Sequence, residues 1–233
     1  MNHPVFPLPA TPAEAARLLD EPLEAVLDSA AALRERHHGT RVSLCAIINA
    51  RSGDCGMDCR FCSQSSHNHT PIAHFPFLEA AELRERILRL AGWPVRRIGI
   101  VTSGGALEEQ ELHCLLSVVH DLPEDVRRRV CTSLGRLPEK HLRELEQAGV
   151  RRYHHNLETS RGYYPRICST QLWEQRRDTV VRAQTAGLSV CAGGLFGLGE
   201  SWGDRIDFAF SLRALGVRHV PMNFLHPHPQ TPL

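Results

Sequence analysis

Three cysteines lie close together in the sequence, at Cys55, Cys59 and Cys62. Their CxxxCxxC spacing places three thiols on one short segment and supplies no obvious fourth ligand nearby. Structural zinc sites normally have four ligands, usually in two separated pairs. Three thiolates instead suit an iron–sulfur cluster in which one iron stays open, for instance to a cofactor that carries an amine and a carboxylate. We therefore expect such a cluster here, with a zinc knuckle or buried free thiols as the alternatives.

A second segment that could belong to a functional site is GGLFGLGE at residues 193–200, which follows a predicted strand. Glycine lacks a β-carbon, so a backbone rich in glycine can approach a flat ligand closely. The segment therefore indicates a cofactor site, whereas a nucleotide-binding loop or a simple turn would explain the glycines taken alone.

Polar residues also occur at the end of one predicted strand and within another. Asn156 and Glu158 alternate along the chain and so can point to one face, while Asn223 has apolar neighbours. A buried amide needs hydrogen-bonding partners, which the amide or urea group of a ligand would supply. The adjacent His155 could instead be a hydrogen-bonded histidine of the core. Asn223 could instead be a structural residue that ties strands together.

Strand-like and helix-like segments alternate in the chain and must position these residues. A helical stretch from Thr11 to about His37 comes first, and a β-prone run at 42–50 precedes the cysteines. Five further strands are predicted at 97–102, 129–133, 152–157, 188–193 and 217–225, after helices at 79–90, 108–119, 139–148, 173–186 and 202–215. Repeated βα units wind into a parallel, TIM-type (β/α) barrel. We expect an α/β fold with a helical extension (1–40) and a six-stranded barrel core (41–233) that is truncated relative to eight strands.

The bulk composition is that of an ordinary globular protein and excludes some functions. The 233 residues are 42% hydrophobic and 23% charged, with a formal net charge of +1. That charge balance gives no reason to expect binding to nucleic acid or to an acidic membrane. Apolar runs long enough for a membrane span and a secretory pattern are both missing from the sequence. We therefore expect a cytoplasmic protein whose eight cysteines are reduced.

Taken together, these motifs resemble the biotin synthase family of radical S-adenosylmethionine (SAM) enzymes. The resemblance runs from about Ser43 to Leu233 and includes an aromatic residue, Phe61, before the last cysteine of the loop. The matching segments are residues 49–53, 55–65, 153–160, 191–201, 221–225 and 231–233. Hydrogenase maturase HydE and methylornithine synthase share the cysteine loop but not the histidine–asparagine run together with the segment around Asn223.

The resemblance implies a [4Fe–4S] cluster on Cys55, Cys59 and Cys62 whose open iron chelates SAM. Reductive cleavage of SAM would yield a 5′-deoxyadenosyl radical that abstracts hydrogen from dethiobiotin. The glycine segment corresponds to the family's SAM-contacting element, through Gly193, Gly194, Leu195, Gly197 and Glu200.

The resemblance also assigns roles to four further side chains. Asn156 and Glu158 match positions that contact the SAM ribose and dethiobiotin, and Asn223 matches the residue that faces the dethiobiotin ring. Arg176 would lie near SAM and the substrate carboxylate, with a solvated helix arginine as the alternative.

Sulfur in this family comes from a second, auxiliary iron–sulfur cluster, [2Fe–2S] or larger, and here the sequence departs from the pattern. Cys131 and Cys191 match two of its ligands, but Gly99 stands where another cysteine is expected. Cys168 is additional, so we predict a donor site formed by Cys131, Cys168 and Cys191. The alternative is that Cys168 is a small buried hydrophobic residue.

The resemblance further implies a flavodoxin- or ferredoxin-type electron donor and is compatible with a homodimer. Two other functional hypotheses stay open at this point. One is a radical SAM enzyme of the HydE or methylornithine synthase type, and the other is an inactive iron–sulfur fragment.

Overall fold

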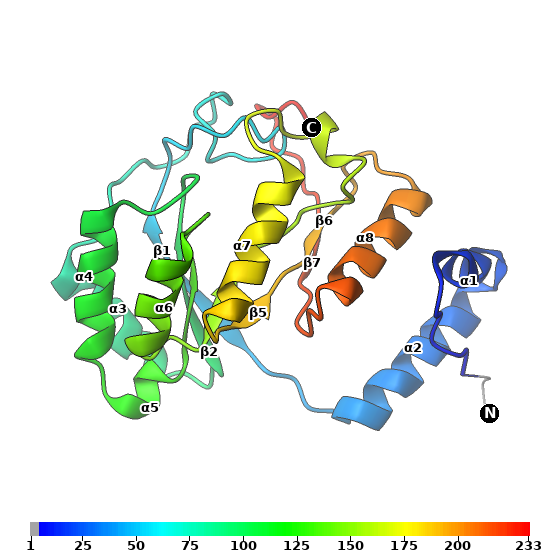
Figure 1. The fold of residues 1–233 in the computed structure, drawn as a ribbon, viewed down its shortest axis with the longest axis horizontal. Coiled ribbons are helices and arrows are strands. Elements are labelled where there is room, and N and C mark those ends of the chain that lie inside the picture. Colours follow the sequence, from blue (N-terminus) through cyan, green and yellow to red (C-terminus); the bar gives the residue numbers. More distant parts are fainter. Residues whose placement is uncertain (1–4) are drawn as a thin grey trace.

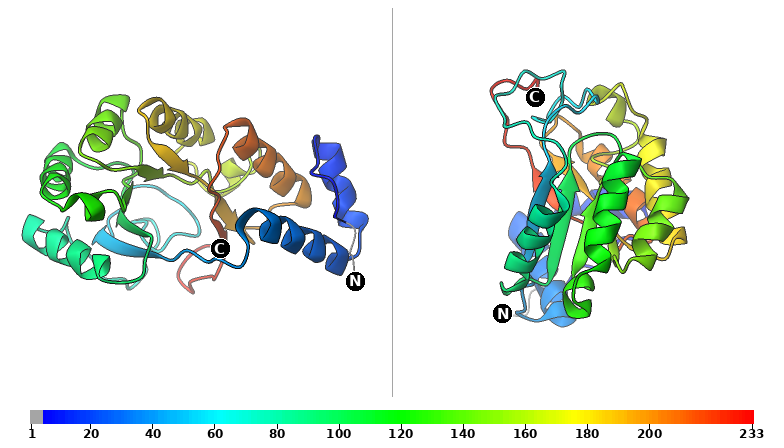
Figure 2. Two further views of the ribbon diagram at one scale, coloured as in Figure 1. Left: turned by 90° about the horizontal axis from the view of Figure 1, so that it is seen from below. Right: turned by 90° about the vertical axis from the view of Figure 1, so that its left-hand side faces the viewer.

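Parallel strands form an arc in the computed structural model, which describes residues 5–233, and helices lie along the outside of that arc (Figures 1 and 2). Five strands form one parallel sheet in the order β1-β2-β3-β4-β5: β1 (Cys45–Arg51), β2 (Arg97–Thr102), β3 (Val130–Ser133), β4 (Arg152–His154) and β5 (Ser189–Cys191). A second parallel pair consists of β6 (Gly194–Phe196) and β7 (Met222–Phe224). The strand order follows the chain order, so each βα unit places its strand directly beside the preceding one.

The fifth strand of the barrel is interrupted. The prediction placed one strand at 188–193, but β5 ends at Cys191 and β6 resumes at Gly194, inside the segment predicted to follow the strand. Parallel bridges join Glu158 to Gly194 and Cys191 to His219, so β5 and β6 share one position and β7 takes the next. The arc therefore has six strand positions, and the predicted incomplete TIM-type barrel is confirmed. Within the described chain no hydrogen-bonded pairing joins β1 to β7.

The five helices predicted between the strands are present, and each begins and ends within two residues of its predicted bounds. They are α3 (Ala80–Ala91), α4 (Glu109–His120), α6 (Glu139–Gln147), α7 (Trp173–Thr185) and α8 (Trp202–Ala214), with the short α5 (Glu124–Arg127) and a 3₁₀ turn, η2 (Tyr164–Arg166), between them. Apolar residues at helical spacing, such as Leu83 and Ile87 on α3, are completely buried against the sheet.

Alternation along the strands divides the arc into two faces. On β1, Ile48 and Ala50 are buried in the core under the helices, whereas Cys45, Ile47 and Asn49 are exposed on the inner face. The inner face therefore carries the residues that could do chemistry, and the outer face carries the residues that hold the fold together.

The N-terminal region forms two helices rather than the single helical stretch predicted. They are α1 (Pro12–Arg17), which continues as the 3₁₀ turn η1 (Leu18–Asp20), and α2 (Leu23–His38). The break falls at Pro22, which has no N–H to donate to a continuous helix. α1 packs beside α8 (Figure 1). The division into residues 1–40 and 41–233 stays a prediction. Among residues 5–233, no helix combines the length and the apolar character of a membrane span.

Candidate active site

The cysteine loop begins where β1 ends and is held by side chains of its own sequence. The buried amide of Asn68 donates to the carbonyls of Cys59 (3.0 Å) and Cys62 (2.9 Å). The Ser65 hydroxyl donates to the Met57 carbonyl at 2.6 Å. These contacts satisfy backbone acceptors inside the loop, so the thiols of Cys59 and Cys62 are positioned without a metal.

Asp58 ties this loop to the segment that follows β4. Its carboxylate accepts hydrogen bonds from the backbone N–H groups of Ser169 (2.9 Å) and Thr170 (3.1 Å) and from both of their hydroxyls. Burial raises the pKa of Asp58, but the hydrogen bonds from these two residues outweigh it and hold the pKa well below its usual value. The carboxylate is therefore charged, and it fixes the two loops together.

A cavity of about 180 Å³ lies beside the three cysteines. Cys55, Cys59 and Cys62 contribute to the wall of this cavity, and so do Glu158 and Arg176. Within residues 5–233, no three metal-ligating side chains are close enough to hold a single ion. In an iron–sulfur cluster each thiolate binds its own iron, so the ligands can be spread more widely than around one ion.

Glu158 and Arg176 form a buried polar network on that wall. Arg176 Nη1 lies 3.3 Å from the Glu158 carboxylate and donates to the Asn156 carbonyl at 2.7 Å, while its Nε donates to the Tyr164 hydroxyl at 2.9 Å. The Asn156 amide donates to Glu158 at 3.3 Å. Glu158 has a φ of 70°, a left-handed backbone conformation that is costly for a residue with a side chain and is often found at functional sites. The alternative of a solvated Arg176 is wrong, and the sequence analysis missed Tyr164.

Several polar atoms along the same cavity have no partner. His155 Nε2, Thr102 Oγ1 and Ser103 Oγ are buried, and each lacks a hydrogen bond within the described chain. Burial, followed by the positive charge of Arg176, holds the pKa of His155 well below its usual value, so the ring is neutral. Buried groups of this kind normally have partners, and their absence here fits a polar ligand such as SAM beside the cysteines. Thr102 and Ser103 were missed, although a polar pair at the end of a predicted strand was a usable signal.

The glycine segment has a packing role in the structure. A β-carbon at Gly193 would overlap the Pro221 carbonyl, and one at Gly194 would overlap the Glu158 carbonyl. Glu200 accepts from the N–H groups of Gly197 (3.0 Å) and Leu198 (2.7 Å) and pairs with Arg205 at 2.8 Å.

These contacts bear on the predicted cofactor-binding set. Gly193, Gly194, Leu195, Gly197 and Glu200 do not line the cavity beside the cysteines, as far as the described residues show. Contact between them and a cofactor therefore stays a prediction. Asn223, on β7, donates to the Gly194 carbonyl at 3.3 Å and so ties β7 to β6.

A second group of thiols lies on the inner face, toward the amino ends of β1 and β3. Cys131 is flanked by Gly99 and Arg152 on the neighbouring strands, and Cys45 begins β1. Burial raises the pKa of Cys131 to about 11, and repulsion from the Cys45 and Cys191 thiols adds to the rise. Burial also raises the pKa of Cys191, as does Cys45. The thiols of Cys45, Cys131 and Cys191 are therefore neighbours.

The structure does not bring together the three cysteines of the predicted donor site, Cys131, Cys168 and Cys191. Cys168 lies on the loop after β4, where the next residues, Ser169 and Thr170, donate to Asp58 of the cysteine loop. Asp58 draws this loop to the cysteine loop, at the opposite end of the barrel from Cys131. Cys45, the first residue of β1, is exposed and belongs to this group in place of Cys168.

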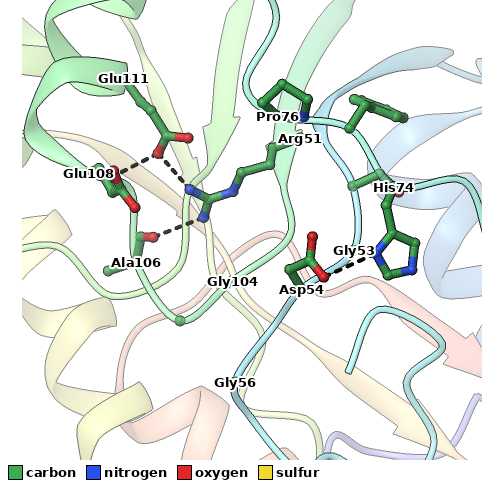
Figure 3. A pocket seen from close by; sticks show the side chains of 13 residues that line it. Arg51, Gly53, Asp54, Gly56, His74, Pro76, Gly104, Ala106, Glu108 and Glu111 are labelled. Atoms are coloured by element: carbon green, nitrogen blue, oxygen red, sulfur yellow. Dashed lines mark hydrogen bonds and ion pairs between the residues drawn. The ribbon is translucent and has the colours of Figure 1, made fainter. Parts of the chain in front are cut away.

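A larger cavity of about 630 Å³ adjoins the cysteine loop (Figure 3). Arg51 crosses its wall and binds Glu111 at 2.5 Å and the Ala106 carbonyl at 3.0 Å. The side chains of Asp54 and His74 point toward each other, with 3.0 Å between Oδ1 and Nδ1. Arg51 is fully engaged by protein groups, so it supports the segment after β2 and is not free to bind a ligand.

Comparison with known proteins defines the class first. The family model of the Radical SAM superfamily matches residues 51–212. A curated biotin synthase from Desulfovibrio desulfuricans is 62% identical over 96% of this chain and 71% of its own length. One from Heliobacterium modesticaldum is 41% identical over 96% of this chain and 68% of its own length. The chain belongs to the biotin synthase family of radical SAM enzymes, sulfurtransferases that use SAM and a [4Fe–4S] cluster.

Solved structures show the same fold at lower identity. Methylornithine synthase (PylB) is 20% identical with a TM-score of 0.82 over 96% of this chain and 66% of its own. The hydrogenase maturase HydG from Carboxydothermus hydrogenoformans is 20% identical with a TM-score of 0.80 over 96% of this chain and 55% of its own. At this identity the likeness supports the fold alone.

Proposed function

We propose that this chain inserts sulfur into dethiobiotin to form biotin, with two iron–sulfur sites at opposite ends of one barrel interior. The observation that carries the proposal is the separation of the inner thiols into two groups. Cys55, Cys59 and Cys62 lie beyond the carboxyl end of β1, where the active sites of (β/α) barrels are found. Cys45, Cys131 and Cys191 lie deeper, on the strands themselves.

Residues around the smaller cavity would hold the cofactors. Cys55, Cys59 and Cys62 would ligate the [4Fe–4S] cluster, which together with SAM supplies the radical chemistry of the family when bound. The unpaired atoms of His155 and Thr102 would bind polar groups of SAM.

The buried network of Asn156, Glu158 and Arg176 would orient the ligands. Asn156 and Glu158 would contact the SAM ribose and the substrate. Arg176 would keep Glu158 charged, because burial alone raises the pKa of this carboxyl. Asn223 would face the dethiobiotin ring, and Gly193, Gly194, Leu195, Gly197 and Glu200 would border the cofactor from the neighbouring strand.

The deeper thiols would hold the auxiliary cluster that donates sulfur. Cys45, Cys131 and Cys191 would provide three thiolate ligands when iron is bound, and the positive charges of Arg97 and Arg152 favour the ionised form of Cys131. A β-carbon at Gly99 would meet the Cys131 sulfur at 3.6 Å, so Gly99 faces the same space and leaves it open. The set can accommodate a [2Fe–2S] or a larger cluster.

The remaining parts of the proposal concern partners and location. Reduction of the cluster would come from a flavodoxin- or ferredoxin-type donor, the chain would act in the cytoplasm, and a homodimer is compatible with it. Binding of a reduced donor is measurable by the change in the reduction rate of the cluster as the donor concentration rises.

Isotopic tracing of sulfur tests the proposed function. The chain is reconstituted anaerobically with iron and isotopically labelled sulfide, then given SAM, dethiobiotin and a reductant. We expect labelled biotin and 5′-deoxyadenosine. Cys131→Ser should abolish biotin but keep 5′-deoxyadenosine, whereas Cys114→Ser, on the outer helix α4, should retain both products. Biotin without label, or 5′-deoxyadenosine that forms only with another substrate, would overturn the proposal.

A further inference from the structure

Cys59 and Cys168 lie on two loops that hydrogen bonds hold side by side, and the proposed function uses only Cys59. Both residues belong to the buried core and are only 7% and 3% exposed. The surrounding backbone is held as well, since the N–H of Arg60 donates to the Ile167 carbonyl at 2.9 Å. Together with the Asp58 contacts, this backbone hydrogen bond holds Cys59 and Cys168 next to each other independently of any metal.

The Cys59–Cys168 pair lies between two cavities. Cys59 lines the 180 Å³ cavity of the cluster site, and Cys168 lines a separate cavity of about 370 Å³. Tyr164 and Trp173 also line this second cavity, and the exposed Arg161 stands at its rim. A small oxidant can therefore reach Cys168 from outside without passing through the cluster site.

We propose that Cys59 and Cys168 form a reversible disulfide whenever the cluster is absent, and that this bond preserves Cys59 for cluster loading. The proposal rests on the assignment of Cys59 as a cluster ligand, because a sulfur bound to iron is not available for a disulfide. Thiol reductants reverse a disulfide, whereas sulfinic and sulfonic acids persist. A cluster-free chain that met an oxidant would otherwise lose an essential ligand.

Hydrogen peroxide is a sufficient oxidant for this step. Two S–H bonds and the O–O bond break, and one S–S bond and two molecules of water form. Two electrons pass from the sulfurs to the peroxide. A thiol reductant reverses the bond by exchange through a mixed disulfide.

Peptide mapping of the iron-free 233-residue chain tests the inference directly. After one equivalent of peroxide and alkylation of the remaining thiols, trypsin releases peptide 52–60, which contains Cys55 and Cys59, and peptide 167–176, which contains Cys168. We expect these two peptides to be linked in the wild type and in Cys55→Ser, with the link removed by reductant. Cys168→Ser should not form the link, and Cys114→Ser should form it as the wild type does.

Reloading of iron tests the protective role. Wild-type and Cys168→Ser chains are treated with excess peroxide, reduced with dithiothreitol and reconstituted with iron and sulfide. We expect the variant to recover about threefold less iron, because Cys59 proceeds to irreversible acids. Equal recovery, or a disulfide joining Cys55 to Cys62 with Cys168 alkylated, would overturn the inference. Neither readout depends on biotin formation, so a failure here is distinguishable from a failure of the proposed function.

Discussion

The Asp58 carboxylate joins two loops whose contacting residues are 111 positions apart in sequence. Its neighbours Cys59 and Met57 line the cluster cavity, and its acceptors are filled by Ser169 and Thr170. None of this follows from sequence spacing, because a lone aspartate inside a cysteine motif has no local partner. The residue types of the cluster site were predictable from the motif, whereas the group that fixes their position depends on tertiary contact.

Loss of the Asp58 charge should loosen the cysteine loop. Asp58→Asn keeps the size of the side chain but replaces one acceptor oxygen with a donor group that faces other donors. We expect a loss of roughly 1–3 kcal/mol in the free energy of unfolding, measured by urea denaturation, and faster release of iron to a chelator. Asp121→Asn, at an exposed aspartate beside His120, should change neither quantity. A wild-type rate of iron release from Asp58→Asn would contradict the role given to this residue.

His155 should make the stability of the chain depend on pH. The pKa of His155 is lowered in the folded chain. Below about pH 6.5, His155 is therefore protonated in the unfolded chain but stays neutral in the folded chain. The associated stability is present above that pH and is lost as the pH falls. As the pH falls from about 7.5 to about 5.5, we expect His155 to lower the free energy of unfolding by about 1.4 kcal/mol.

The matched variant for this effect is His155→Gln, which cannot be protonated. Urea denaturation at the two pH values should show a smaller loss for His155→Gln than for the wild type, by about the same 1.4 kcal/mol. His154 also has a pKa lowered by burial, so part of the pH dependence should persist in the variant. Parallel pH profiles for the two proteins would show that His155 is protonated equally in both states.

At the scale of elements, the helices were predictable and the fifth strand was not. Apolar spacing fixes α3 or α7 to within two residues, because each helix buries one face. The break between β5 and β6 depends instead on partners from elsewhere, since Pro221 and the Glu158 carbonyl press against Gly193 and Gly194. The glycines suggested closeness to a ligand, and the closeness observed is to the protein's own backbone. Cys168 was misassigned for a similar reason, because its loop is placed by Asp58.

Alanine substitutions at two glycines should show which position is closely packed and which has room for a β-carbon. Gly193→Ala places a β-carbon against the Pro221 carbonyl, and we expect a loss of at least 1–3 kcal/mol, on the order of other overpacked sites. Gly99→Ala meets its nearest atoms at 3.6 Å, an ordinary contact, and should cost roughly 1 kcal/mol or less. Urea denaturation measures both. Equal stability of the two variants would contradict the packing described for β6 and β7.

At the scale of the whole molecule, the barrel interior holds its thiols in two groups at different depths. The three-cysteine loop follows β1, and the second group is spread over β1, β3 and β5. The sequence pattern was sufficient to predict a (β/α) barrel with a cluster loop beyond its first strand. The composition of the second group was not predictable from one sequence, because Cys45 joins it only through the parallel register of β1, β2 and β3.

Iron content per chain tests this arrangement most directly. One cubane cluster holds about four irons per chain. After anaerobic reconstitution, we expect the wild type and Cys168→Ser to bind clearly more iron than this. Cys45→Ser combined with Cys131→Ser should fall to about four, with the remaining cluster still responding to SAM in its spectrum. A wild type that stops at four irons, or a loss of iron in Cys168→Ser that the Cys45 and Cys131 substitutions do not cause, would contradict the account.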